Sequence, residues 1–171
     1  MESKSFDHGK ISRALLTLHS IHDTISNLIE WNKIIGSADD YYSSPNGMQL
    51  LAANCTLITA IGEGVNRINR LMPDFLSLHF PDIPWRDIIG MRNRIAHGYF
   101  ELDADLVYEA IRNDIPELDT TINKAIKLIQ IQLNYLSFSS IYITQRTAEP
   151  QRQLCRGRVI SRFVESTLRQ P

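Results

Sequence analysis

Cysteine and long apolar runs are scarce in this chain of 171 residues, and each scarcity excludes a class of protein. Only two cysteines are present, Cys55 and Cys155, and they stand far apart in the sequence. This spacing fits neither a disulfide framework nor a metal-binding motif, so we expect a reducing, cytoplasmic compartment and no metal or cofactor. No apolar run approaches the roughly 20 residues of a membrane span. The first ten residues are polar, unlike a signal peptide, so we expect no membrane partner.

The charge of the chain is nearly balanced but unevenly distributed. The net charge is −1, which gives no overall attraction to nucleic acids. Residues 144–171, however, hold six arginines and two glutamates, a net charge of +4. The length and the 43% apolar content fit one globular domain. We therefore predict a helical bundle over residues 1–143 and a basic extension over residues 144–171. This extension has two interpretations. It is a tail or a helix that docks on the bundle, or it is a basic arm that binds RNA or a partner protein.

Apolar residues recur at helical spacing along most of the chain. Long amphipathic patterns cover residues 9–35, 45–71, 84–97 and 103–138, with residues 73–83 expected to form a loop. The strongest strand-like run, residues 141–143, is too short to build a sheet. The pattern predicts an all-α fold, an antiparallel bundle of four to five helices.

In the first of these segments the apolar residues step by three and four, as in a heptad seam. The seam residues are Ile11, Leu15, Leu18, His22, Ile25 and Ile29. We interpret His22 as a helix–helix contact rather than a ligand.

Capping residues and prolines predict where the later helices begin. Ser44 is expected to cap the second helix with Pro45 in its first turn, and Pro84 is expected at the first position of the next. Further on, Pro116 is expected to break or kink the chain, with Asp114 as a new N-cap.

The segment from Arg86 to Tyr99 has the highest density of phosphate-binding and proton-transferring groups. It holds Arg86, Arg92, Arg94, His97 and Tyr99. An arginine can grip a phosphate with two parallel hydrogen bonds, and a histidine titrates near neutral pH. Together they form a minimal set for cleaving RNA without a metal ion.

Helical spacing sorts these groups by face. Arg92 and Tyr99 are seven positions apart and nearly coincide, whereas Asn93 and His97 are one turn apart and are neighbours. Arg92 and His97 would then flank a common groove. The alternative interpretation is that this Arg and His are ordinary solvent-facing or structural residues of an amphipathic helix.

The same segment resembles the signature of HEPN-domain proteins, an Arg followed by a few residues and a His. The extended match is to HepT-type toxins of HEPN–MNT toxin–antitoxin pairs. It includes Trp85, Gly-Met-Arg-Asn at residues 90–93 and His-Gly-Tyr at residues 97–99. Residues 62–64, Gly-Glu-Gly, resemble the family's Gly-Glu-Ala segment, and residues 113–118 resemble its Asn-Asp-Leu-Pro-x-Leu segment. The resemblance spans roughly residues 8 to 135 and does not cover the basic extension.

The resemblance implies a ribonuclease toxin that acts as a homodimer on RNA. Arg92 would hold the scissile phosphate, His97 would act as general base or acid, and Asn93 would orient His97. The cognate MNT-type nucleotidyltransferase, the antitoxin, would silence the toxin by adding AMP to Tyr99.

Three further residues are expected to support this site. Arg86 and Arg94 would contact RNA, and Glu63 would orient an arginine near Arg92 or simply pair with Arg67 on the helix surface. Two alternatives from other classes remain: a non-catalytic nucleotide- or RNA-binding helical module, and a purely structural helical adaptor.

Overall fold

The computed structural model describes residues 7–97 and 103–136, with only the backbone at residues 92–94, 96 and 97. The chain divides into two units, residues 1–131 and residues 132–171, and the arrangement below is that of the first. In the second unit only residues 132–136 are described, and they are helical. The predicted boundary at residues 143 and 144 lies outside the described residues and stays a prediction.

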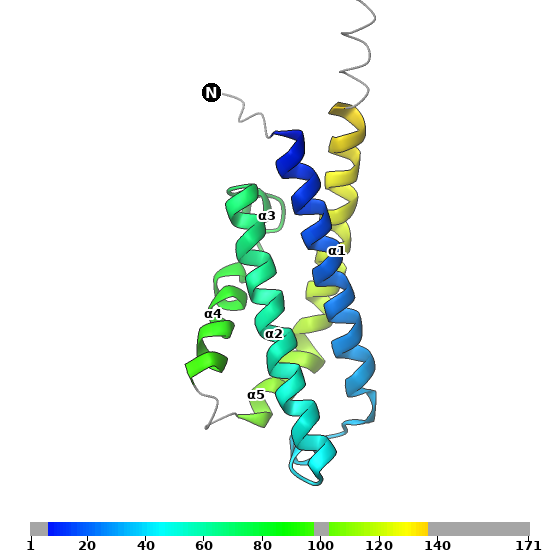
Figure 1. The fold of residues 1–171 in the computed structure, drawn as a ribbon, viewed down its shortest axis with the longest axis vertical. Helices are drawn as coiled ribbons and strands as arrows, with labels where there is room; N and C mark the ends of the chain where they lie inside the picture. The colour runs from blue at the N-terminus through cyan, green and yellow to red at the C-terminus, as the bar shows by residue number, and fades with distance from the viewer. Residues whose placement is uncertain (1–6, 98–102, 137–171) are drawn as a thin grey trace, which may run out of the picture. The chain divides into compact units, whose positions relative to one another are not determined.

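The first unit is built from helices, and none of its described residues lies in a strand. The long helices are α1 (His8–Trp31), α2 (Pro45–Leu71) and α4 (Trp85–His97), with a further helix from residue 115 onward. The shorter ones are α3 (Phe75–His79), α5 (Ala104–Glu109), the 3-10 turns Asn32–Ile34 and Ala38–Tyr41, and the π-helix Ala110–Asp114. Helix α2 packs against both α1 and α4 (Figure 1). The predicted all-α class is confirmed.

Helix α2 is the central core helix of this unit. Its inner face carries six buried apolar residues at helical spacing: Leu51, Cys55, Ile58, Ile61, Val65 and Ile68. By length and composition alone this helix could also cross a membrane, which the sequence analysis did not anticipate. Its buried face packs on α1 and α4, the arrangement of a core helix in a globular bundle.

The buried face of α1 differs from the predicted seam. Its buried residues are Ile11, Ala14, Leu18, Ile21, Ile25 and Leu28. The predicted seam members Leu15, His22 and Ile29 are only half-buried. The reason is that α1 presents a wide stripe to more than one neighbour. His22 lies at the edge of this stripe, and its Nδ1 is 2.7 Å from Asp119 Oδ1 on the helix after residue 115. The interpretation of His22 as a helix–helix contact is therefore confirmed.

Several boundary predictions can be compared with the structure. Ser44 caps α2, because its side chain accepts a hydrogen bond from Gly47 N at 3.1 Å, and Pro45 follows at the first position. Pro84 lies one residue before α4 rather than inside it. A break or kink was predicted at Pro116; the break is wrong, because the chain stays helical, and Asp114 ends a π-helix instead of capping a new helix. The wider π turn lies just where Pro116 withholds an N–H from the helix ladder.

Residues 73–83, expected as a loop, contain the short helix α3. Its buried residues Phe75 and Leu76 tie the segment to the core. Asp74 precedes α3 in a left-handed conformation with φ of 65°. This compact connection brings the chain to the start of α4 and so positions the helix that carries the predicted catalytic residues.

Candidate functional site

Helix α4 carries most of the predicted site residues on one continuous backbone. Arg86, Arg92, Asn93, Arg94 and His97 all fall within Trp85–His97. At 1.5 Å per residue, the backbone positions of Arg92 and His97 are about 7.5 Å apart along the helix axis. The structure therefore confirms the predicted helix.

The roles predicted for these residues are not tested by the structure. The side chains of Arg92, Asn93, Arg94 and His97 lie outside the described part, and so does Tyr99. The side chain of Arg86 is described, and it is exposed. The catalytic roles therefore stay predictions.

Trp85, the aromatic residue of the motif, fixes the start of α4. Its side chain is buried and its indole N–H donates to the Phe80 carbonyl oxygen at 2.9 Å. The Pro84 carbonyl oxygen accepts hydrogen bonds from Asp87 N at 2.9 Å and Ile88 N at 3.1 Å. The carboxylate of Asp87 stands in the first turn, where the helix dipole favours negative charge. These contacts make Trp85 a structural anchor of the helix.

The Gly-Glu-Gly segment lies on α2 where this helix meets α1. A Cβ atom built on Gly64 would come within 2.7 Å of Ile21 Cγ1, so the missing side chain permits close helix packing there. A glycine at position 64 avoids this overlap. Glu63 is exposed and, with Arg67 and Arg70, lines a hollow of about 430 Å³ between α1 and α2. Its predicted role in orienting an arginine near Arg92 stays a prediction.

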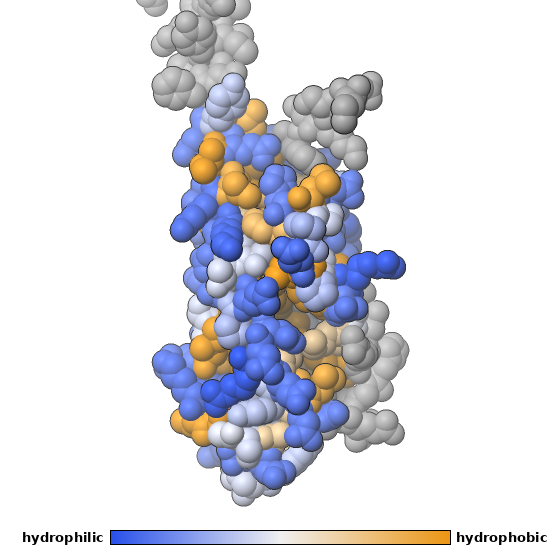
Figure 2. Space-filling model, turned by 180° about the vertical axis from the view of Figure 1, so that it is seen from behind, coloured by the Kyte–Doolittle hydropathy of each residue, from blue (hydrophilic) through white to orange (hydrophobic). Residues whose placement is uncertain are grey.

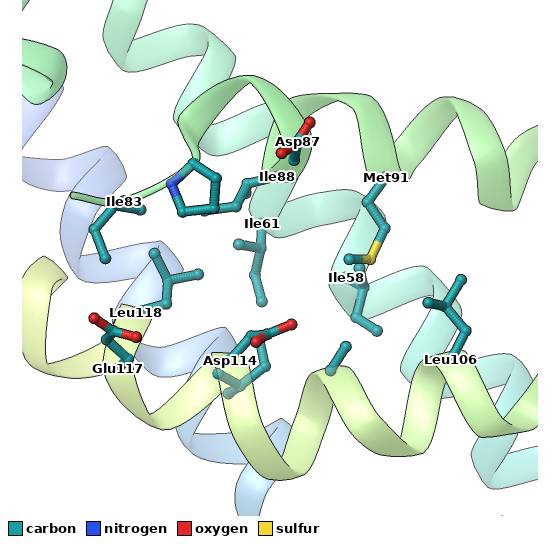
Figure 3. A pocket seen from close by; sticks show the side chains of 13 residues that line it. Ile58, Ile61, Ile83, Asp87, Ile88, Met91, Leu106, Asp114, Glu117 and Leu118 are labelled. Carbon is teal, nitrogen blue, oxygen red and sulfur yellow. The ribbon is translucent and has the colours of Figure 1, made fainter. Parts of the chain in front are cut away.

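The third matching segment, residues 113–118, faces α4 across an apolar groove (Figure 3). Asp114 and Glu117 lie on one side of this groove and Asp87 on the other. The space-filling view from behind shows hydrophobic surface recessed between hydrophilic residues (Figure 2). The sequence analysis did not predict this groove.

Metal-binding groups were also sought among the described side chains. Within that part of the chain, no cluster of three or more His, Cys, Asp or Glu residues could hold a metal ion.

An all-α bundle with an Arg and a His on one helix, and with the matching segments at residues 62–64 and 113–118, agrees with the resemblance to the HEPN class. Comparison with known proteins refines this class. The sequence profile of the family described as Ribonuclease HepT-like matches residues 36–125, more than half of the chain. The chain belongs to this HepT-like ribonuclease family.

Individual relatives agree with the family assignment. A protein of Methanocaldococcus jannaschii named a "putative RNase" is 31% identical over 101 residues, covering 59% of this chain and 85% of that protein. A second one from that organism, with the same description, is 29% identical over 110 residues, covering 64% of this chain and 88% of the relative. A "probable ribonuclease HepT" of Thermococcus cleftensis is 40% identical over 58 residues, 34% of this chain and 49% of that protein. No solved structure gives a significant match.

Proposed function

We propose that this protein is a metal-independent endoribonuclease of the toxin type. The observation that carries the proposal is membership of the HepT-like ribonuclease family together with the position of the Arg-Asn…His motif on helix α4. The names of the relatives support an RNA substrate. The absence of a disulfide framework from the sequence supports a cytoplasmic location.

The chemistry assigned to the motif uses the RNA's own 2′-hydroxyl as the nucleophile. His97 takes the proton of the 2′-hydroxyl while water protonates the leaving 5′-oxygen, or His97 protonates that oxygen while water takes the proton of the 2′-hydroxyl. The 2′-oxygen forms a bond to phosphorus while the bond to the 5′-oxygen breaks, which leaves a 2′,3′-cyclic phosphate. Arg92 holds the non-bridging oxygens and stabilises the charge that develops on them. Asn93, one helical turn before His97, orients the imidazole.

Cleavage of RNA in EDTA tests the proposal. The purified protein is expected to cut RNA with the chelator present, and His97→Ala is expected to lose this activity while keeping its helical circular dichroism. His19→Ala is the matched control, because His19 is an exposed histidine on α1 outside the motif. Cleavage by His97→Ala, or loss of cleavage in EDTA, would contradict the mechanism. Salt-dependent RNA binding without any cleavage would favour the binding-module alternative.

Control by an antitoxin is the second part of the proposal. A nucleotidyltransferase of the MNT type adds AMP to the Tyr99 hydroxyl, forming a phosphodiester and releasing pyrophosphate from ATP. Tyr99 is seven positions after Arg92, so on a continuous helix an adenylate there adds negative charge on the face of Arg92 and competes with RNA for the arginine.

Mass spectrometry after incubation with the nucleotidyltransferase and ATP tests this control. Tyr99→Phe is expected to block the addition of AMP, and Tyr135→Phe, which removes an exposed tyrosine, is expected to leave it intact. Modification of Tyr99→Phe at the parent rate would place the acceptor elsewhere.

The third part of the proposal is a homodimer. A single Arg and His make a sparse site, and a two-fold axis would bring two copies of each residue to one cleft. Sedimentation should give a dimer at micromolar concentration. A monomer with undiminished cleavage would contradict the dimeric site.

A further inference from the structure

An apolar groove runs between α4 and the helical stretch from α5 to residue 118 (Figure 3). Helix α2 supplies its floor. The residues that define it are Ile58 and Ile61 on α2, Ile88 and Met91 on α4, and Ile115 and Leu118 on the opposite wall.

The size of the groove suits side chains of a binding partner. Its volume is about 330 Å³. A cavity of about 150 Å³ accommodates a benzene molecule. The groove therefore has room for about two aliphatic or aromatic side chains, and the described residues leave one side of it open.

The charged residues of the groove that the structure describes all have the same sign. The groove is lined by three exposed carboxylates, Asp87, Asp114 and Glu117. Among the described residues, no other charged residue lines it. None of the three forms an ion pair with another described residue. Carboxylates without an ion-pair partner among the described residues, placed around an apolar floor, favour a ligand with an apolar centre and cationic flanks. They repel phosphate, so the groove is unsuited to the RNA backbone.

The groove also lies on a separate face of α4 from the predicted catalytic pair. Met91 and Asp87 are one turn apart and face the groove. The positions of Asn93 and His97 are also one turn apart, and on average they are rotated by about 120° from those of Met91 and Asp87. A molecule in the groove can therefore contact α4 without covering the helix face that carries positions 93 and 97.

We propose that this groove is the docking site for a helical segment of a partner protein, with an apolar face flanked by Lys or Arg residues. Two parallel helical walls form a groove that accepts an amphipathic helix, whose apolar side chains enter at intervals of three and four residues. The cationic flanks pair with Asp87 on one wall and with Asp114 and Glu117 on the other. This binding does not depend on the ribonuclease activity proposed above.

Fluorescence anisotropy with a designed peptide tests the docking site. The probe is a labelled amphipathic helix of about two heptads, with Leu on one face and Lys on the flanks. A matched peptide carries Glu in place of Lys. The full chain is expected to bind the Lys peptide at least about tenfold more tightly than the Glu peptide.

Charge reversal locates the binding surface. The double variant Asp114→Lys, Glu117→Lys is expected to weaken binding of the Lys peptide by about tenfold or more, because attraction at two positions becomes repulsion. Asp23→Lys, Asp39→Lys is the control, since it makes the same charge change at exposed positions outside the groove. Circular dichroism checks that both variants remain helical.

The results of these binding experiments distinguish between possible occupants of the groove. Equal binding to both double variants, or equal binding of the two peptides, would overturn the proposal. Loss of self-association in the groove variant, measured by sedimentation, would assign the groove to a second copy of this chain and overturn the partner assignment. Displacement of the Lys peptide by RNA would show that the groove is part of the RNA-binding surface, which also contradicts it. RNA cleavage is measured separately, so a failed ribonuclease assay leaves the peptide result intact.

Discussion

Tyr41 holds together a buried polar network, and removing its hydroxyl tests how this bundle is stabilised. The Tyr41 hydroxyl donates to Asn32 Oδ1 at 2.6 Å and accepts from Asn54 Nδ2 at 3.1 Å. Asn54 Nδ2 also donates to Asn32 Oδ1 at 2.8 Å, and Asn32 Nδ2 donates to Asn54 Oδ1 at 2.9 Å. Tyr41 and Asn54 have no exposed surface and Asn32 is 4% exposed, so water cannot replace a lost partner.

Tyr41→Phe keeps the ring but leaves one N–H of Asn54 without an acceptor. A buried polar group left unsatisfied costs about 1–3 kcal/mol. We expect a loss of about 2 kcal/mol in the free energy of unfolding, which for a chain of this size lowers Tm by about 4–8 °C. Urea and thermal unfolding followed by far-UV circular dichroism measure both quantities. Tyr135→Phe is the control, because Tyr135 is 75% exposed.

The pH dependence adds a second test of the same residue. Burial raises the pKa of Tyr41, so the folded state retains the phenolic proton more strongly than the unfolded state. The contribution of Tyr41 to stability is complete below about pH 10 and is lost as the pH rises above that value. Tyr41→Phe should therefore lose less stability than the parent protein on going from neutral to strongly alkaline pH. If Tyr41→Phe had the same free energy of unfolding as Tyr135→Phe at neutral pH, the stabilising role of the polar network would be refuted.

Three further predictions concern other parts of the bundle. Gly64→Ala should destabilise the fold by about 1–3 kcal/mol because the new methyl group overlaps Ile21, whereas Gly90→Ala, with open space around it, should stabilise by up to about 1 kcal/mol in the same urea titration. Cys55 is buried, and burial raises the pKa of its thiol. A variant that keeps Cys55 as its only cysteine should therefore react with iodoacetamide only as fast as it unfolds. Rapid alkylation of the native state would contradict this. Hydrogen bonds from the backbone N–H groups at residues 36 and 37 lower the pKa of Asp40, so its contribution is present above about pH 4 and lost as the pH falls; Asp40→Asn should flatten the acid limb of the stability profile, and an unchanged limb would oppose this.

The helices and their inner faces were predictable where one apolar register dominates. Helix α2 is such a case, from the Ser44 cap to its end at Leu71. The buried face of α1 was not predictable in this way. Leu15 and Ala14 both fit a heptad pattern, and only packing against the neighbouring helices determines which of them is buried. The sequence did contain a signal for the polar network, since Asn54 falls on the apolar stripe of α2, where a polar side chain needs partners. Which partners it finds depends on tertiary packing.

The candidate site was predictable as a set of residues on one helix but not as a geometry. Spacing alone places Asn93 and His97 one turn apart on α4. The width of the groove depends on the distance between α4 and the segment that contains Asp114. This distance is set by packing on α2, and the local sequence of neither segment specifies it. Local periodicity cannot express such a distance between segments.

The chemical identity of the RNA ends after cleavage tests the central claim most directly. RNA incubated with the full chain in EDTA is analysed by mass spectrometry, with His97→Ala and His19→Ala in parallel. The account predicts fragments that end in a 2′,3′-cyclic phosphate and begin with a 5′-hydroxyl, formed by the parent protein and by His19→Ala but not by His97→Ala. Fragments with a 3′-hydroxyl and a 5′-phosphate, or cyclic-phosphate ends formed equally by His97→Ala, would contradict it.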